Sequence, residues 1–99
     1  MQEQKDLIVN RKYQKADQTV MVLVRRITGG EISGILYQFE AWPNAQEDAS
    51  ARVTSGDKYF VRNAYQAKLR ELQEENWSKS GSGTFGFGED TRFFDPEAL

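Results

Sequence analysis

Alternating hydrophobic and polar positions predict a β-hairpin in the first half of the chain. Two runs of apolar and β-branched residues, 20–24 and 35–39, lie on either side of a Gly-Gly pair at 29–30. A two-residue type I′ turn needs positive φ at both central positions, so a pair of glycines favours this turn. We therefore expect a central hairpin whose strands cover residues 19–28 and 31–41.

This turn also fixes the register, because it places Val24 opposite Ile35 and Val22 opposite Tyr37. One face of the hairpin then carries Val20, Val22, Val24, Ile35, Tyr37 and Phe39. The other face is also largely apolar, with Met21, Leu23, Ile27, Ile32 and Leu36. A sheet with two apolar faces must be covered on both sides. We therefore expect a homodimer, or a monomer whose own tail covers the second face.

Apolar residues at helical spacing predict a helix from about residue 58 to residue 77. The stripe consists of Val61, Ala64, Tyr65, Leu69 and Leu72, which recur every three or four positions. Asp57 is a candidate N-cap for this helix. An alternative interpretation starts the helix at Asn63, because residues 58–61 are rich in strand formers and could pair with residues 52–54.

Two shorter segments, residues 7–9 and 52–54, predict further strands. The expected fold is of the α+β class, with three to five antiparallel strands packed by one helix in a single domain of residues 1–77. From Ser78 onward the composition changes to Gly and Ser, and then to an acidic sequence with several phenylalanines. We therefore expect residues 78–99 to form a flexible arm.

The composition argues against most kinds of catalysis. The chain of 99 residues contains no His and no Cys, which removes the imidazole base, the thiolate nucleophile and the usual zinc, iron–sulfur and haem ligands. The acidic pairs lack the ligand spacing of a calcium loop. We expect no catalytic residue, no metal site and no cofactor, and we expect that the protein is not an enzyme.

The aromatic residues of the arm point to protein–protein interaction. Four phenylalanines lie within residues 85–94, which is too many for a solvated tail. We predict a small regulatory subunit, assembly factor or inhibitor of a larger protein, and leave open whether the tail docks on its own domain, a second subunit or another protein. The candidate partner-binding residues are Trp42, Trp77, Phe85, Phe87, Phe93 and Phe94.

An alternative function follows from a basic segment that contains an aromatic residue. Cations that follow phosphates and rings that stack on bases are typical of proteins that bind single-stranded nucleic acid. The candidate residues are Arg11, Lys12, Tyr13, Lys15, Arg25 and Arg26. The competing interpretation is an ordinary solvated edge of the sheet, and the whole chain, with 13 Lys and Arg against 15 Asp and Glu, is slightly acidic.

The chain shows no pattern typical of a membrane segment. The first six residues carry no apolar run, and the longest apolar stretch, residues 20–24, is far too short to span a bilayer. The absence of Cys suits a reducing compartment. We therefore expect a soluble protein of the cytoplasm with no membrane partner.

Overall fold

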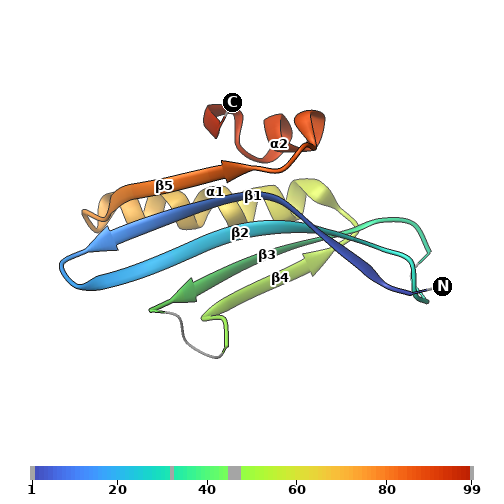
Figure 1. Ribbon diagram of the computed structural model, residues 1–99, viewed down its shortest axis with the longest axis horizontal. Helices are drawn as coiled ribbons and strands as arrows, with labels where there is room; N and C mark the ends of the chain where they lie inside the picture. Colours follow the sequence, from blue (N-terminus) through green and yellow to red (C-terminus); the bar gives the residue numbers. More distant parts are fainter. Residues whose placement is uncertain (1, 32, 45–47, 99) are drawn as a thin grey trace.

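The chain folds around a five-stranded antiparallel sheet, whose strands run roughly from side to side in Figure 1. The structure, a computed structural model, describes residues 2–31, 33–44 and 48–98. The strands stand in the order β4-β3-β2-β1-β5. Their bounds are β1 Gln4–Lys15, β2 Gln18–Thr28, β3 Leu36–Pro43, β4 Ala51–Ser55 and β5 Ser78–Thr84. The α+β class and the antiparallel sheet that the sequence predicts are confirmed.

The helices α1 (Lys58–Glu74) and α2 (Gly88–Phe94) pack on the same face of the sheet. α1 lies across β2, β3 and β4, whereas α2 lies beside it against β1 and is followed by the short 3-10 helix η1 (Pro96–Ala98) (Figure 1). We call this side the helix face, and its strand residues include Val9, Arg11, Tyr13, Val22, Val24, Tyr37 and Phe39. The other side is the open face, whose strand residues include Lys12, Met21, Leu23, Arg25, Glu40, Trp42 and Arg52.

The central hairpin forms with a longer loop than predicted. Val24 pairs with Phe39, four residues beyond the predicted partner Ile35, so the predicted register is wrong. The second strand begins at Leu36 instead of residue 31, and Ile32 lies outside the described residues. Because the shift is an even number of residues, Val24 and Phe39 still point to the same face. The hydrophobic pattern therefore predicted the face of the paired strand residues correctly, but the turn did not predict the pairing. The prediction for Ile35 was wrong, because Ile35 lies before β3 and is 45% exposed.

The two glycines of the predicted turn have a different role. Gly29 and Gly30 have φ values of 81° and 61°, and a side chain on Gly29 would collide with the carbonyl oxygen of Gln2. They therefore allow the chain after β2 to pass close to the chain before β1. The two-residue turn is instead formed by residues 16–17 between β1 and β2, where Ala16 has a φ of 55°.

α1 begins at Lys58, so residues 58–61 are helical and the alternative strand is wrong. Asp57 is the N-cap, because its carboxylate accepts a hydrogen bond of 3.0 Å from the backbone N–H of Tyr59. The predicted apolar stripe faces the sheet. Its residues Val61, Tyr65 and Leu72 are buried, and Ala64 and Leu69 are half-buried against them.

α1 ends at Glu74, three residues before its predicted end. Asn76 adopts a φ of 67°, and the backbone N–H of Trp77 donates to the carbonyl of Leu72 at 2.9 Å. This pairing is a Schellman-type C-cap, in which the residue after the helix takes the left-handed conformation. The cap turns the chain toward the far edge of the sheet.

Residues 78–84, expected to belong to a flexible arm, form the edge strand β5. Gly81 pairs with Lys12 and Gly83 pairs with Asn10, which joins β5 to β1. The composition of β5, mainly Ser and Gly, does not favour a strand by itself. Backbone pairing with β1 therefore decides the conformation. The remainder of the expected arm forms α2 and η1.

The core lies between the sheet and its two helices. It is built from the apolar residues of the helix face and the stripe of α1, and the C-terminal segment adds Phe94, which is completely buried. The ring of Phe94 lies 5.3 Å from the ring of Tyr37, measured between centroids. The C-terminal segment is therefore part of the packing of the domain.

Candidate functional site

The six residues predicted to bind nucleic acid are divided between the two faces of the sheet. Lys12 and Arg25 belong to the open face. Arg11 and Tyr13 are buried under the helices. Lys15 and Arg26 also turn to the helix side, where Lys15 Nζ donates to the carbonyl of Glu75 at 2.7 Å and Arg26 approaches Asp90 at 3.7 Å. The fold therefore does not bring the six residues into one surface.

Arg11 stands at the centre of a buried polar cluster on the helix face. Its Nε donates to Asp95 Oδ2 at 2.7 Å, and its Nη2 donates to Asp95 Oδ1 at 2.6 Å. Tyr65 donates to the same carboxylate at 3.0 Å, and Tyr13 accepts from Arg11 Nη1 at 3.1 Å. Arg11 is 7% exposed and Asp95 is 3% exposed. This two-pronged ion pair joins the C-terminal segment to β1.

Burial and pairing act on these groups in opposite directions. Burial by itself lowers the pKa of the Arg11 guanidinium, but hydrogen bonds to Asp95 and Tyr13 outweigh this effect, so the pKa is raised above its ordinary value. Burial, followed by the charge of Asp95, raises the pKa of the Tyr65 phenol. At neutral pH Arg11 is therefore a cation and Tyr65 a neutral phenol donor.

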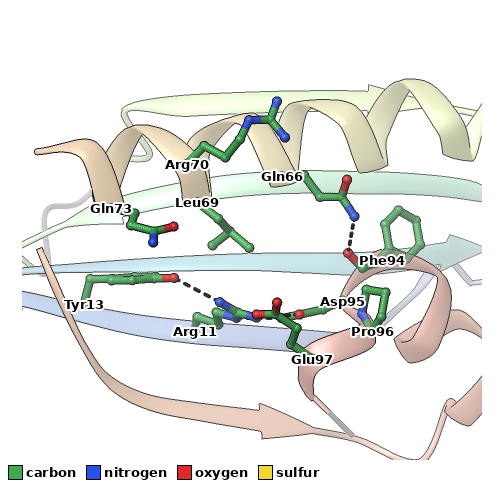
Figure 2. Close-up of a pocket in the computed structure, with 10 residues that line it drawn as sticks. All are labelled: Arg11, Tyr13, Gln66, Leu69, Arg70, Gln73, Phe94, Asp95, Pro96 and Glu97. Atoms are coloured by element: carbon green, nitrogen blue, oxygen red, sulfur yellow. Dashed lines mark hydrogen bonds and ion pairs between the residues drawn. The ribbon is translucent and has the colours of Figure 1, made fainter.

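A cleft of about 350 Å³ lies above this ion pair, between α1 and the C-terminal segment. Figure 2 shows Gln66, Leu69 and Gln73 along α1 on one side, with Tyr13 and Arg11 from β1 opposite them. Gln66 Nε2 reaches the carbonyl of Phe94 at 3.4 Å. The lining also includes the charged side chains of Arg70 and Glu97, so the cleft offers both neutral hydrogen-bonding groups and charges of each sign.

Three of the phenylalanines predicted to bind a partner pack within the domain. Phe94 belongs to the core because its ring fills the space between the sheet and α1. Phe93 is half-buried, with its ring 5.1 Å from that of Tyr59. Phe87 is half-buried beneath the guanidinium of Arg26, at 4.5 Å. These contacts use much of the aromatic surface that made the tail a candidate docking element.

The other predicted aromatic contacts differ in exposure and side. Trp77 is half-buried against the core on the helix side. Trp42 is half-buried on the open face, and Phe85 is 44% exposed. The ring of Phe85 lies over Gly83, where a β-carbon would approach it to about 3.0 Å. Since Gly83 pairs with Asn10 of the open face, Phe85 lies on that face as well.

The open face carries a strong excess of positive charge in its strands. Lys5, Lys12, Arg25 and Arg52 point to this side, together with one carboxylate, Glu40. Glu40 is 1% exposed and forms ion pairs with Arg25 and, at 2.9 Å, with Arg52. The two arginine side chains are themselves 31% and 46% exposed. Glu40 therefore holds two guanidinium groups that remain accessible to a ligand.

A small slot lies on the open face, next to Lys12 and Arg52. It has a volume of about 190 Å³ and is lined by Lys12, Thr19, Met21 and Trp42. Lys12, Met21 and Trp42 stand side by side on β1, β2 and β3. The guanidinium of Arg52 lies 5.9 Å from the ring of Trp42. The slot thus combines an aromatic ring, an apolar floor and an ammonium group.

A second exposed feature lies where α1 begins. Ile35, Tyr59 and Phe60, which we call the helix-start patch, are 45%, 58% and 59% exposed. Lys58 and Arg62 border it, and both cations lie against the ring of Phe93, at 4.5 Å and 4.8 Å. Of the five large apolar side chains that are exposed in the described part of the chain, three belong to this patch. Apolar surface with a cationic rim is typical of an interaction site.

The sequence contained limited signals for these surfaces. The pairing of Arg11 with Asp95 joins residues 84 positions apart, so no local pattern indicated it. For Arg52, the sequence predicts only a place in the short strand of residues 52–54, with no role at a surface. Tyr59 and Phe60 lie between the cap residue Asp57 and Val61, the first buried residue of the stripe. This position outside the apolar stripe is the one signal in the sequence that these two aromatic residues are exposed.

Comparison with known proteins finds no matching family model, no similar curated protein and no similar solved structure. Within residues 2–31, 33–44 and 48–98, no three acidic side chains gather to form a metal-binding group. In the same residues, neither helix has the length and hydrophobicity required to cross a membrane.

Proposed function

We propose that this chain is a small non-enzymatic interaction module that binds another protein through the helix-start patch. The observation that carries the proposal is the exposure of Tyr59 and Phe60 in the first turn of α1 and of Ile35, whose backbone lies beside Gly56 just before that helix, with side chains 45–59% exposed. A cytoplasmic location and a role as regulatory subunit, assembly factor or inhibitor belong to the same proposal.

The rim of the patch indicates the chemistry of the partner. Lys58 and Arg62 border Tyr59 and Phe93, and the chain's own Asp90 lies 3.5 Å from Lys58 Nζ. The acidic and aromatic C-terminal segment therefore provides an internal example of what this end of the molecule binds. We propose that the partner presents an apolar side chain flanked by carboxylates, because opposite charges at the rim favour association.

The test uses the full chain to capture a binding protein, which is then purified for affinity measurements. Phe60→Ser should weaken binding at least about tenfold if Phe60 is an interface anchor. Met21→Ala removes an exposed apolar side chain from the opposite face and serves as the matched control, for which we expect unchanged affinity. Equal affinity of the Phe60→Ser variant and the unmodified protein would contradict the proposal.

The expected homodimer is tested with the protein alone by sedimentation equilibrium. A dimer that dissociates in the Phe60→Ser variant would show that a second copy occupies the patch, which would overturn the assignment to a different protein. A monomer at all concentrations, together with partner binding that depends on Phe60, supports the proposal.

A further inference from the structure

The open face differs from the rest of the surface in the sign and spacing of its charges. The chain as a whole has a net charge of −2, yet the strands of this face carry four cations and one buried carboxylate. Two exposed carboxylates from outside the strands, Glu3 and Asp48, lie 3.8 Å from Lys5 and 3.4 Å from Arg52 and leave Lys12 and Arg25 without a further acidic neighbour among the ion pairs of the described residues. Lys12, Arg25 and Arg52 come from three different strands, β1, β2 and β4. Cations spread across a flat surface suit an extended anionic chain more than a single compact anion.

Two aromatic rings lie on the same face as these cations. Trp42 lies on β3 beside the slot, and Phe85 lies over Gly83 on β5. Neighbouring strands are about 4.8 Å apart, so β3 and β5 are separated by about 14 Å across the sheet. Met21 and Lys12 continue the row of Trp42 toward Gly81, and Phe85 lies over Gly83, two positions further along β5. The glycine at position 83 leaves the space that the ring of Phe85 occupies, since a side chain there would press against that ring.

We propose that the open face binds single-stranded nucleic acid. The ring of Trp42 stacks on one base at the slot, and Phe85 stacks on another base of the same strand. Lys12, on β1 between the two rings, contacts the intervening phosphates, and Arg25 on β2 and Arg52 on β4 contact neighbouring phosphates of the same strand. The guanidinium groups retain outward N–H donors while Glu40 fixes their position and Asp48 accepts from Arg52 Nη2 at 3.4 Å, because an arginine has five donors and these carboxylates use only part of them.

The rings favour a single strand over a duplex and over an acidic peptide. A duplex hides the faces of its bases, whereas unpaired bases are free to stack on aromatic side chains. An acidic peptide would satisfy the cations but has no flat groups for Trp42 and Phe85. The proposal uses residues on the opposite side of the sheet from the helix-start patch, so it stands or fails independently of the proposed protein partner.

The test is fluorescence anisotropy with the full chain and a labelled oligothymidylate of about 15 nucleotides, at about 50 and 200 mM salt. We expect affinity in the micromolar range at the lower salt concentration, and weaker binding of a duplex of the same length. Trp42→Ala should lower the affinity about tenfold or more through lost stacking, and Trp42→Phe should restore most of it. Phe85→Ala removes an exposed ring and should lower the affinity of a protein that remains folded.

Salt dependence tests the role of the cations separately. Each phosphate contact with a single strand contributes about 0.7 to the slope of log affinity against log salt, so Lys12→Gln should reduce that slope by about this amount. Arg70→Ala removes an exposed cation from α1, and Tyr59→Ala removes an exposed ring from the helix-start patch. We expect both of these matched controls to bind the oligonucleotide like the unmodified protein.

Three outcomes would overturn the proposal. The first is no binding of the oligothymidylate at the lower salt concentration by a protein whose circular dichroism shows it to be folded. The second is binding that Trp42→Ala and Phe85→Ala leave unchanged. The third is equal or tighter binding of a polyglutamate peptide of similar length and charge, which would assign the open face to an acidic protein segment.

Discussion

The two faces of the sheet both contain an arginine paired with a carboxylate, but the pairs are in very different surroundings. On the helix face, Arg11 and Asp95 are 7% and 3% exposed and join the C-terminal segment to β1. On the open face, Glu40 is buried while Arg25 and Arg52 remain partly exposed. The ion pair of Arg11 with Asp95 fixes the C-terminal segment to the sheet. Glu40, in contrast, holds the two arginine side chains in place at the surface.

The difference shows how one sheet supports two roles. The helix face is covered by α1, α2 and the ion pair, so its residues act mainly in folding. The open face alternates apolar residues such as Leu23 and Met21 with charged residues along the same strands. Because charged side chains interrupt the apolar surface, this face is compatible with water and remains available to a ligand.

The largest expected effect is the loss of the buried ion pair. Asp95→Ala leaves the Arg11 charge buried without its partner, which should lower the free energy of unfolding by about 3–5 kcal/mol. Urea denaturation measures this change. On the open face, Glu40→Ala should cost less than half as much, since Arg25 and Arg52 can regain hydration. Equal losses for the two variants would contradict the contrast between the faces.

The double variant Arg11→Met with Asp95→Leu provides a control for the first prediction. It removes both charges together, so it should be more stable than Asp95→Ala alone, because no buried charge is left unpaired. A double variant as unstable as the single variant would indicate that packing, and not charge, determines the loss.

Replacing two phenylalanines of the C-terminal region should have different effects on stability, because one belongs to the helix face and the other to the open face. Phe94 is fully buried, and Phe94→Ala should lower the free energy of unfolding by about 3–5 kcal/mol. Phe85 is 44% exposed, and Phe85→Ala should cost less than about 1 kcal/mol. Thermal or urea unfolding of both variants provides the comparison. A tolerated Phe94→Ala would mean that the C-terminal segment contributes little to the core.

The smallest expected effect is a pH dependence from the helix face. The pKa of Tyr65 is raised by burial and by Asp95, so the unfolded chain releases this phenol proton at a lower pH than the folded protein. The stabilisation is complete below the ordinary tyrosine value of about 10 and is lost above it, by up to about 1.4 kcal/mol per pH unit. Unfolding measured between about pH 9 and pH 11 should show a shallower decline for Tyr65→Phe. Identical slopes would exclude Tyr65 as the cause.

Local patterns predicted the elements better than their pairing. The stripe of α1 and its cap Asp57 follow from short-range spacing, and the structure confirms both. The hairpin register was wrong because Gly29 and Gly30 serve a close approach to Gln2, which is distant in the sequence. The actual two-residue turn uses Ala16, a residue with no special preference for positive φ.

The candidate surfaces were harder to predict, because they depend on long-range contacts. Arg11 looked like a surface cation until Asp95, 84 residues away, was placed beside it. Trp42 was expected at a partner interface, but its neighbours Lys12 and Arg52 come from β1 and β4 and define a different kind of site. Side-chain alternation in the strands predicted which residues share a face, and it could not predict which face the helices cover.

The chain contains two tryptophans, and they provide the most direct test of the division between the faces. Trp42 lies on the open face and Trp77 packs on the helix side, so the two indole N–H signals of an ¹⁵N-labelled sample report on the two faces separately. On titration with oligothymidylate, we expect the Trp42 signal to shift and the Trp77 signal to stay in place. A shift of the Trp77 signal alone, or no shift of either signal at saturating oligonucleotide, would contradict the assignment of binding to the open face.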